Sequence, residues 1–212
     1  MGQPGFDRVE LVVRTMAQTA VDNERYFSEL DAVVGDGDFG YSLARGFEIV
    51  LSDWDGLDRT DSATFLRKVA VIVTSRVGGT SGPLWGTGFL RAGGAVNGAL
   101  AIGADDAVAM LRAAIEGVKQ RGQSDLGDKT LLDALVPAVD TLEQRLKAGD
   151  AGAAAVAAAA RTAREAADAT SSMLARRGRA AYTGERSIGS PDAGAVGVAV
   201  MFEKLAKAWP EA

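Results

Sequence analysis

The alanine-rich stretch from residue 151 to residue 177 constrains the fold more than any other part of the sequence. Alanine is the strongest helix former because it loses no side-chain entropy in a helix, so we expect one long helix here. Its small side chains also allow neighbouring helices to approach closely. Aromatic residues make up only 6% of the chain, which is low for a sheet protein. The stretch therefore predicts an all-α protein.

The rest of the chain repeats the helical period, with apolar residues mostly at three- and four-residue steps. We expect helices over 6–30, 41–52, 62–77, 82–101, 105–120, 130–147 and 194–208, and a loop over 178–193. The β-branched runs 69–73 and 196–200 are the candidate strands, but both lie inside longer helical patterns, which favours helices. About eight helices with short connections predict an up-and-down bundle or a closed helical barrel. No linker or internal repeat divides the sequence, so we expect a single domain spanning residues 1–212.

Two residue types are missing, and their absence excludes several chemistries. The chain has no cysteine, so it supplies no disulfide, thiolate nucleophile, iron-sulfur cluster or cysteine-bound zinc. It has no histidine either, which excludes a Ser-His-Asp triad, a histidine base, a histidine-bound metal and a phosphohistidine carrier. Catalysis by this chain would therefore depend on carboxylates, lysine, arginine, hydroxyls, backbone amides or a hard metal ion.

The charge balance favours a bound cation. The formal net charge is -5 and the pI is near 4.9, which argues against nucleic acid or an anionic membrane as a partner. Residues 1–7 lack the basic and apolar parts of a signal peptide, and no apolar run approaches the length of a membrane span. We therefore expect a soluble, cytoplasmic protein.

Three aspartates lie in a short break after the first predicted helix. Asp31, Asp36 and Asp38 alternate with glycines, which tolerate tight turns. Such close carboxylates repel one another unless a cation lies among them, and an oxygen-only ligand set suits Mg²⁺. Three carboxylates can bridge two such ions. A solvated turn whose aspartates cap helix ends explains the same pattern, so both interpretations stay open.

Three further loops concentrate glycine, hydroxyl and charged residues. The segment 78–83, Gly-Gly-Thr-Ser-Gly-Pro, precedes a predicted helix, where free backbone amides can bind an anion. It is neither a Walker A loop nor a dinucleotide fingerprint, because it lacks the lysine of the first and the preceding strand of the second. The segments 127–130 and 176–194 carry Lys129 and several arginines, which can bind phosphate or simply face solvent. Lys129 can equally pair with neighbouring acids.

Taken together, these loops resemble the L subunit of bacterial dihydroxyacetone kinases, the subunit that binds ADP or ATP. The matching segments stand in the family's order and lie at 30–40, 45–47, 78–84, 86–87, 127–130 and 178–194. The resemblance implies an all-α, up-and-down eight-helix barrel or bundle with the nucleotide site in loops at one end.

The resemblance also implies roles for individual residues. Asp31, Asp36 and Asp38 would hold two Mg²⁺ ions on the phosphates of ADP or ATP. The residues implied to bind the nucleotide are Phe39, Gly40, Ser42, Thr80, Ser81, Gly122, Leu131, Arg179, Asp192, Ala193 and Gly194. Arg179 is the implied catalytic residue, because a guanidinium offsets the negative charge of a phosphoryl group in transfer. No general base is assigned to this chain.

Partners follow from the same resemblance. In the family, a separate K subunit binds dihydroxyacetone through a histidine, and a chain without histidine fits the role of the other subunit. We therefore expect a phosphotransferase subunit that acts on an alcohol group and is inactive without its K-type partner. The donor is either exchangeable ATP or a tightly held ADP that a multiphosphoryl carrier of the sugar phosphotransferase system re-phosphorylates. A homodimer is the assembly left open, and neither nucleic acid nor a membrane is an expected partner.

Two positions depart from the family's usual pattern. Family members usually carry histidine where this chain has Phe39, and asparagine where it has Ser42. Phe39 cannot donate a hydrogen bond to a phosphate or a sugar hydroxyl, which leaves the final acceptor open. The alternatives are a kinase subunit for another small keto-sugar or polyol, such as erythrulose, and a non-catalytic nucleotide-dependent regulatory partner.

Overall fold

The structure is a computed structural model that describes residues 3–210. Within this range every regular element is a helix and none is a strand, so the all-α class predicted from the sequence is confirmed. Both β-branched runs lie in helices, 69–73 in α4 (Ser62–Arg76) and 196–200 in α9 (Ala193–Ala208).

The other helices follow the predicted order. The α-helices are α1 (Phe6–Asp22), α2 (Glu24–Asp31), α3 (Phe39–Ser52), α5 (Ser81–Ala95), α6 (Ala104–Gly122), α7 (Leu132–Lys147) and α8 (Gly152–Ala169). Three 3₁₀ helices lie between them, η1 (Trp54–Gly56), η2 (Thr170–Ser172) and η3 (Arg179–Ser187). No helix in the described range is long and apolar enough to cross a membrane.

Three of the predicted boundaries were wrong, two in the first half of the chain and one in the loop before α9. The stretch 6–30 is not one helix, because the backbone of Asn23 leaves the helical region at φ -112° and ψ 17°. Asparagine hydrogen-bonds locally through its side chain and so competes with the helix. The helix predicted over 82–101 ends at Ala95, and the loop predicted over 178–193 contains η3.

The alanine-rich helix is also shorter than predicted, since α8 ends at Ala169 rather than at residue 177. The hydroxyls of the next three residues each donate to the carbonyl three residues earlier, at 2.6 Å from Thr170, 2.7 Å from Ser171 and 2.9 Å from Ser172. Such side-chain bonds compete with the helical ladder. They tighten the chain into η2, and the backbone then turns away at Met173 in an extended conformation.

The described residues form two compact units, and each is described by itself. Unit 1 comprises residues 3–21 and 42–123, and unit 2 comprises residues 22–41 and 124–210. The single domain and the closed eight-helix barrel therefore stay predictions.

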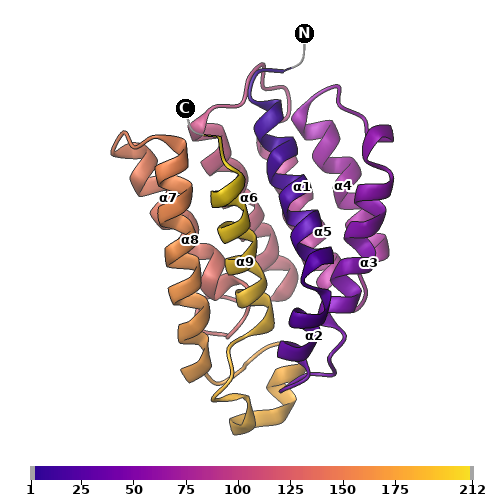
Figure 1. Cartoon of the computed structure of the whole chain (residues 1–212), viewed down its shortest axis with the longest axis vertical. Coiled ribbons are helices and arrows are strands. Elements are labelled where there is room, and N and C mark those ends of the chain that lie inside the picture. Colours follow the sequence, from indigo (N-terminus) through magenta and orange to yellow (C-terminus); the bar gives the residue numbers. More distant parts are fainter. Residues whose placement is uncertain (1–2, 211–212) are drawn as a thin grey trace. The chain divides into compact units, whose positions relative to one another are not determined.

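In unit 1, α4, α5 and α6 pack against one another in chain order (Figure 1). A glycine on α5 allows the close approach of α4, because a Cβ atom at Gly86 would lie 1.9 Å from the hydroxyl oxygen of Thr74. The core of this unit includes the fully buried side chains of Phe47, Phe65 and Val69. The helix packing thus presents the loop before α5 on a rigid support.

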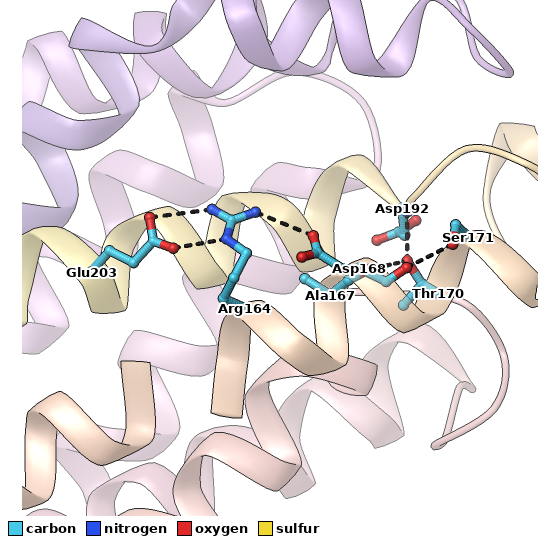
Figure 2. Close-up of polar contacts among 7 residues, drawn as sticks. All are labelled: Arg164, Ala167, Asp168, Thr170, Ser171, Asp192 and Glu203. Atoms are coloured by element: carbon cyan, nitrogen blue, oxygen red, sulfur yellow. Dashed lines mark hydrogen bonds and ion pairs between the residues drawn. The ribbon is translucent and has the colours of Figure 1, made fainter. Parts of the chain in front are cut away.

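In unit 2, α7, α8 and α9 lie side by side, and α2 packs against α9 (Figure 1). The alanines of α8 fill this interface, and Ala155, Ala159 and Ala163 are completely buried. Arg164 of α8 donates to Glu203 of α9 at 2.7 and 3.2 Å, the pair shown in Figure 2. These contacts place the end of α8 beside the start of α9, where several predicted site residues lie.

Candidate functional site

The acidic turn, residues 31–38, connects α2 to α3 in unit 2. The carboxylates of Asp31, Asp36 and Asp38 each offer an oxygen, and these oxygens lie within 4.8 Å of one another. The amide of Gly35 donates to the Asp31 carbonyl at 2.6 Å, and the amide of Phe39 donates to the Asp31 carboxylate at 3.4 Å. A Cβ atom at residue 35 would lie 2.3 Å from Asp31 Oδ1, so a larger residue there would displace the Asp31 carboxylate. The three aspartates therefore form one cluster.

One guanidinium reaches this cluster from a distant part of the chain. Arg179, at the start of η3, forms ion pairs with Asp36 and Asp38, and its Nη1 lies 3.3 Å from Asp38 Oδ2. The three side chains are about half exposed, at 52% for Arg179, 45% for Asp36 and 48% for Asp38. The positive charge offsets repulsion among the carboxylates, which is roughly 1 kcal/mol per pair at this separation in water. The residue implied to be catalytic thus contacts two of those implied to bind metal.

The ligands in the cluster suit a hard divalent cation. Carboxylate oxygens are the protein ligands that Mg²⁺ prefers, and Mg²⁺ normally keeps several waters or binds substrate phosphates as well. The half-exposed carboxylates of Asp36 and Asp38 leave room for such additional ligands. The acidic turn therefore fits Mg²⁺ that is bound together with phosphate groups.

Phe39 and Gly40 begin α3 directly after the acidic turn. The Phe39 ring packs against the Phe27 ring of α2, with the centroids 6.0 Å apart. Gly40 permits a close contact between the two helices, because a Cβ atom there would lie 2.0 Å from the carbonyl oxygen of Glu24. The Phe39 side chain therefore anchors the turn by apolar packing, and it offers no hydrogen bond to a ligand.

A second group of predicted nucleotide residues lies at the start of α9. A Cβ atom at Gly194 would lie 3.3 Å from the Cβ atom of Leu131 and 3.0 Å from Asp192 Oδ2, so these three residues are neighbours. Asp192 caps α9 by accepting a hydrogen bond from the Ala195 amide at 2.8 Å. Its own amide donates to the Thr170 hydroxyl at 2.8 Å, and Figure 2 shows these two residues together. Ala193 is the first residue of the helix.

The carboxyl of Asp192 has an unusual affinity for protons. The pKa of Asp192 is raised to about 7, chiefly by burial, and the nearby charge of Asp133 acts in the same direction. The hydrogen bond from the Ala195 amide and the charge of Lys129 act in the opposite direction without cancelling the rise. A carboxyl with this pKa changes its charge near neutral pH, which an ordinary aspartate does not do.

The sequence pattern did not reveal the contacts of Lys129. Its side chain is buried, with 2% exposed. The ammonium donates to three backbone carbonyls, those of Met173, Ser187 and Ser190. The ammonium thus bonds to carbonyls rather than to Asp128 beside it, which pairs with Arg177 at 3.4 Å, and the carboxyl whose charge acts on Lys129 is that of Asp192. No spacing rule identifies this role, because the carbonyls lie 44 to 61 residues further along the chain.

The other predicted nucleotide residues, Ser42, Thr80, Ser81 and Gly122, belong to unit 1. Ser42 lies beside the loop before α5, since a Cβ atom at Gly78 would lie 2.8 Å from its hydroxyl oxygen. Thr80 directly precedes α5 and makes no capping hydrogen bond, and Gly122 is the last residue of α6. The position of all four relative to the acidic turn stays a prediction.

Unit 1 also contains a hollow of about 890 Å³ over α4, α5 and α6. Its lining includes Arg67, Arg91 and Arg121, and none of the predicted site residues.

Residues 33–207 match the DAK2 domain family. The ADP-binding subunit DhaL of the PEP-dependent dihydroxyacetone kinase of Escherichia coli (strain K12) is 39% identical over 186 residues, which cover 88% of this chain and 89% of that protein. The L-erythrulose 1-kinase of Mycolicibacterium smegmatis is 39% identical over 198 residues, which cover 92% of this chain and 34% of that protein. Sequence similarity therefore extends over most of the chain.

A solved structure has the same fold. The crystal structure of the dihydroxyacetone kinase from C. freundii in complex with AMP-PNP and Mg²⁺ matches with a TM-score of 0.74 and 28% identity over 95% of this chain. This chain spans about a third of that protein, 34% of its length. By family match, identity and fold, the chain belongs to the DAK2 domain family and is a relative of the ADP-binding subunits of dihydroxyacetone kinases.

Proposed function

We propose that the chain is the nucleotide-binding, phosphoryl-transfer subunit of a dihydroxyacetone kinase-type system. It holds ADP or ATP through two Mg²⁺ ions and passes phosphate to a keto-sugar that is bound on a separate K-type subunit. The observation that carries the proposal is the cluster of Asp31, Asp36 and Asp38, whose carboxylate oxygens lie within 4.8 Å of one another. Arg179 forms ion pairs with two of them, Asp36 and Asp38. The relatives named as ADP-binding subunits and the related Mg²⁺ and AMP-PNP complex support it.

The acidic turn is the metal-binding part of the proposed site. Asp31, Asp36 and Asp38 would hold the Mg²⁺ ions, which supply charge neutralisation of the nucleotide phosphates. The start of α9, with Asp192, Ala193 and Gly194, and Leu131 beside it would contact the rest of the nucleotide. Phe39, Gly40, Ser42, Thr80, Ser81 and Gly122 complete the proposed set.

Arg179 has the proposed catalytic role. Its guanidinium already lies against two carboxylates of the cluster, so a short movement of a half-exposed side chain would bring it to a phosphate oxygen. There it offsets negative charge on the phosphoryl group as that group leaves the donor. No general base is assigned to this chain, which has no histidine, and the proposal places activation of the acceptor hydroxyl on the partner.

The partner is a K-type subunit, and without it this chain transfers no phosphate. The name of the E. coli relative, an ADP-binding subunit, supports a system in which a second subunit holds the acceptor. Relatives with PEP-dependent and PTS-dependent names support a multiphosphoryl carrier that re-phosphorylates bound ADP. The proposed place of action is the cytoplasm.

A second acceptor is favoured by one observation. Phe39 packs on Phe27 and offers no polar group, and a relative covering 92% of this chain is an L-erythrulose 1-kinase. The final acceptor can therefore be erythrulose or another small keto-sugar. A regulatory partner that binds nucleotide without transferring phosphate is the other alternative, and it has no structural observation of its own.

Native mass spectrometry of the purified protein tests the metal and nucleotide content. We expect mass increments for one adenine nucleotide and two magnesium ions, either as purified or after addition of Mg²⁺ and ATP. Retention of ADP after buffer exchange would favour the re-phosphorylated cofactor, and reversible binding of ATP would favour the exchangeable donor. No increment under either condition would contradict the proposal.

A transfer assay tests the acceptor. The chain is combined with K-type subunits and either dihydroxyacetone or erythrulose, and sugar phosphate is measured with ATP or with a phosphorylated carrier as donor. The proposal expects product only when both subunits are present. Nucleotide binding without product for any partner and sugar would support the regulatory alternative instead.

A further inference from the structure

A buried lysine bridges the two ends of the segment that carries Arg179. We call residues 173–190 the arginine segment and residues 125–130 the Lys129 loop; both belong to unit 2. Lys129 Nζ donates to the carbonyl oxygens of Met173, Ser187 and Ser190, and the bond to Ser190 is 2.7 Å long. One of these carbonyls precedes Arg179 and two follow it. The ammonium therefore joins the two ends of the arginine segment.

An ammonium group matches this site better than other polar groups. It has three donors on one nitrogen and no acceptor, so it can serve three carbonyls that converge on one point. The donors of arginine are spread over a planar fork, and a glutamine amide has only two donors and adds an acceptor. The chemistry of the site therefore requires lysine rather than polarity in general.

Two features of Lys129 are energetically unfavourable: its charge is buried and its backbone φ is positive. Its side chain is 2% exposed, and burial of a charge is unfavourable without compensating bonds. Its backbone has a φ of +61°, which side-chain-bearing residues rarely adopt. Among the described non-glycine residues, only Gln123 shares a positive φ. An unfavourable conformation that persists at one position indicates a role for that residue in the site.

A buried carboxylate fixes the Lys129 loop. Asp133 accepts a hydrogen bond from the Gly127 amide at 2.6 Å and another from the Thr130 amide at 2.7 Å. These bonds hold the backbone on both sides of Lys129. The loop is therefore a rigid support, and the arginine segment is the part that it holds.

Other bonds at the base of the arginine segment depend on the same closure. The Arg176 amide donates to the Asp128 carbonyl at 3.0 Å, and the Ala175 amide donates to the Ser187 hydroxyl at 3.0 Å. Beyond this base, Arg179 reaches Asp36 and Asp38. Opening the base would therefore release the guanidinium from the acidic cluster.

We propose that Lys129 is a positioning residue for Arg179. By closing the base of the arginine segment, its ammonium keeps the guanidinium beside the acidic cluster, a short movement away from the phosphate oxygen that it contacts in the proposed phosphoryl transfer. The nucleotide part of this inference rests on the proposed function, and the part that concerns the segment does not.

Hydrogen exchange tests the closure in the protein alone. We expect Lys129→Met to speed backbone exchange within 173–190 by about tenfold or more, because three bonds to a charged donor are lost. Lys204→Met is the matched control, since Lys204 is exposed on α9, and it should leave this segment unchanged. Unchanged exchange of 173–190 in folded Lys129→Met would overturn the inference.

Lys129→Arg covers the case in which Lys129→Met does not fold. It keeps the positive charge but cannot direct three donors to one point, so it too should speed exchange within 173–190 relative to the rest of unit 2. If Lys129→Arg folds and protects the segment like the wild type, the closure does not depend on the ammonium and the inference is wrong.

A double-mutant cycle tests whether Lys129 acts through Arg179. Calorimetry measures ADP affinity with Mg²⁺ for Lys129→Met, Arg179→Gln and the double variant. We expect each single variant to weaken binding about tenfold and the double variant to weaken it by the same factor, because both remove one interaction. A product of the two factors in the double variant would show that Lys129 does not act through Arg179.

The two experiments fail in different ways. If the wild type itself binds no ADP with Mg²⁺, the proposed function is contradicted, while the exchange measurement still decides the role of Lys129 in the segment. If ADP binds and exchange is unchanged, the inference fails and the proposed function stands.

Discussion

The acidic turn and the arginine segment meet at Asp36 and Asp38, but they are held in different ways. The turn is shaped by bonds within itself, such as that from the Gly35 amide to the Asp31 carbonyl at 2.6 Å. The arginine segment depends on remote groups, above all on Lys129, which lies 44 residues or more before the carbonyls that it binds. Changes in the turn therefore act on the proposed ligands directly. Changes in the Lys129 loop act on the same site from a distance.

The largest effect is expected in the acidic turn. Asp36→Ala removes one of the three carboxylates of the cluster, so Mg²⁺-dependent binding of ADP should fall by about a hundredfold or more. Calorimetry with Mg²⁺ and with EDTA measures it. Asp55→Ala is the matched control, because Asp55 is exposed in η1. Unchanged affinity in Asp36→Ala would remove the basis of the metal assignment.

The next effect should come from the support of the arginine segment. Asp133→Ala leaves the amides of Gly127 and Thr130 without their acceptor, so the free energy of unfolding should fall by about 3 kcal/mol. Urea unfolding measures it, and exchange within 173–190 should rise as well. Glu165→Ala, at an exposed position of α8, should change stability by less than about 0.5 kcal/mol. A stable Asp133→Ala with a protected segment would show that the loop needs no such support.

The third effect concerns Gly40, the second residue after the acidic turn. Gly40→Ala places a Cβ atom 2.0 Å from the Glu24 carbonyl oxygen, so the first turn of α3 must move and unfolding should become easier by about 2 kcal/mol. Gly56→Ala is the control, since nothing lies within 4 Å of a Cβ atom there. Thermal unfolding of both variants measures the effect. If Gly40→Ala is as stable as Gly56→Ala, α2 and α3 can move apart at this contact without loss of stability.

The smallest effect is a pH dependence of stability that arises from Asp192 at the start of α9. Because burial raises its pKa to about 7, the folded state holds this proton more tightly than the unfolded state does. The resulting stability is present at pH 4 and is lost as the pH rises towards 7. Asp192→Asn keeps an acceptor for the Ala195 amide, so its stability relative to the wild type should improve by roughly 1–2 kcal/mol between pH 6 and pH 8. Parallel stability curves would contradict the raised pKa.

Local chemistry explains which parts of the fold were predictable. Apolar spacing and alanine content predicted the helices, and most helix starts agree within two residues because each depends on a few neighbouring side chains. The end of α8 was missed, although Thr170, Ser171 and Ser172 mark it, because hydroxyl bonds to earlier carbonyls compete with the helix. The break at Asn23 was missed as well, because the apolar pattern continues through it and only the backbone conformation of this residue departs from the helix.

The sequence by itself determined the helical class, the acidic turn and the residues available for chemistry, because these follow from composition and from neighbours in the chain. Only the tertiary structure decided that Arg179 lies on the acidic cluster and that Lys129 holds the segment behind it. The physical reason is that both contacts join groups far apart in the chain, and those of Lys129 go to backbone carbonyls. Every residue has a carbonyl, so no residue type marks in the sequence which ones a buried ammonium will bind.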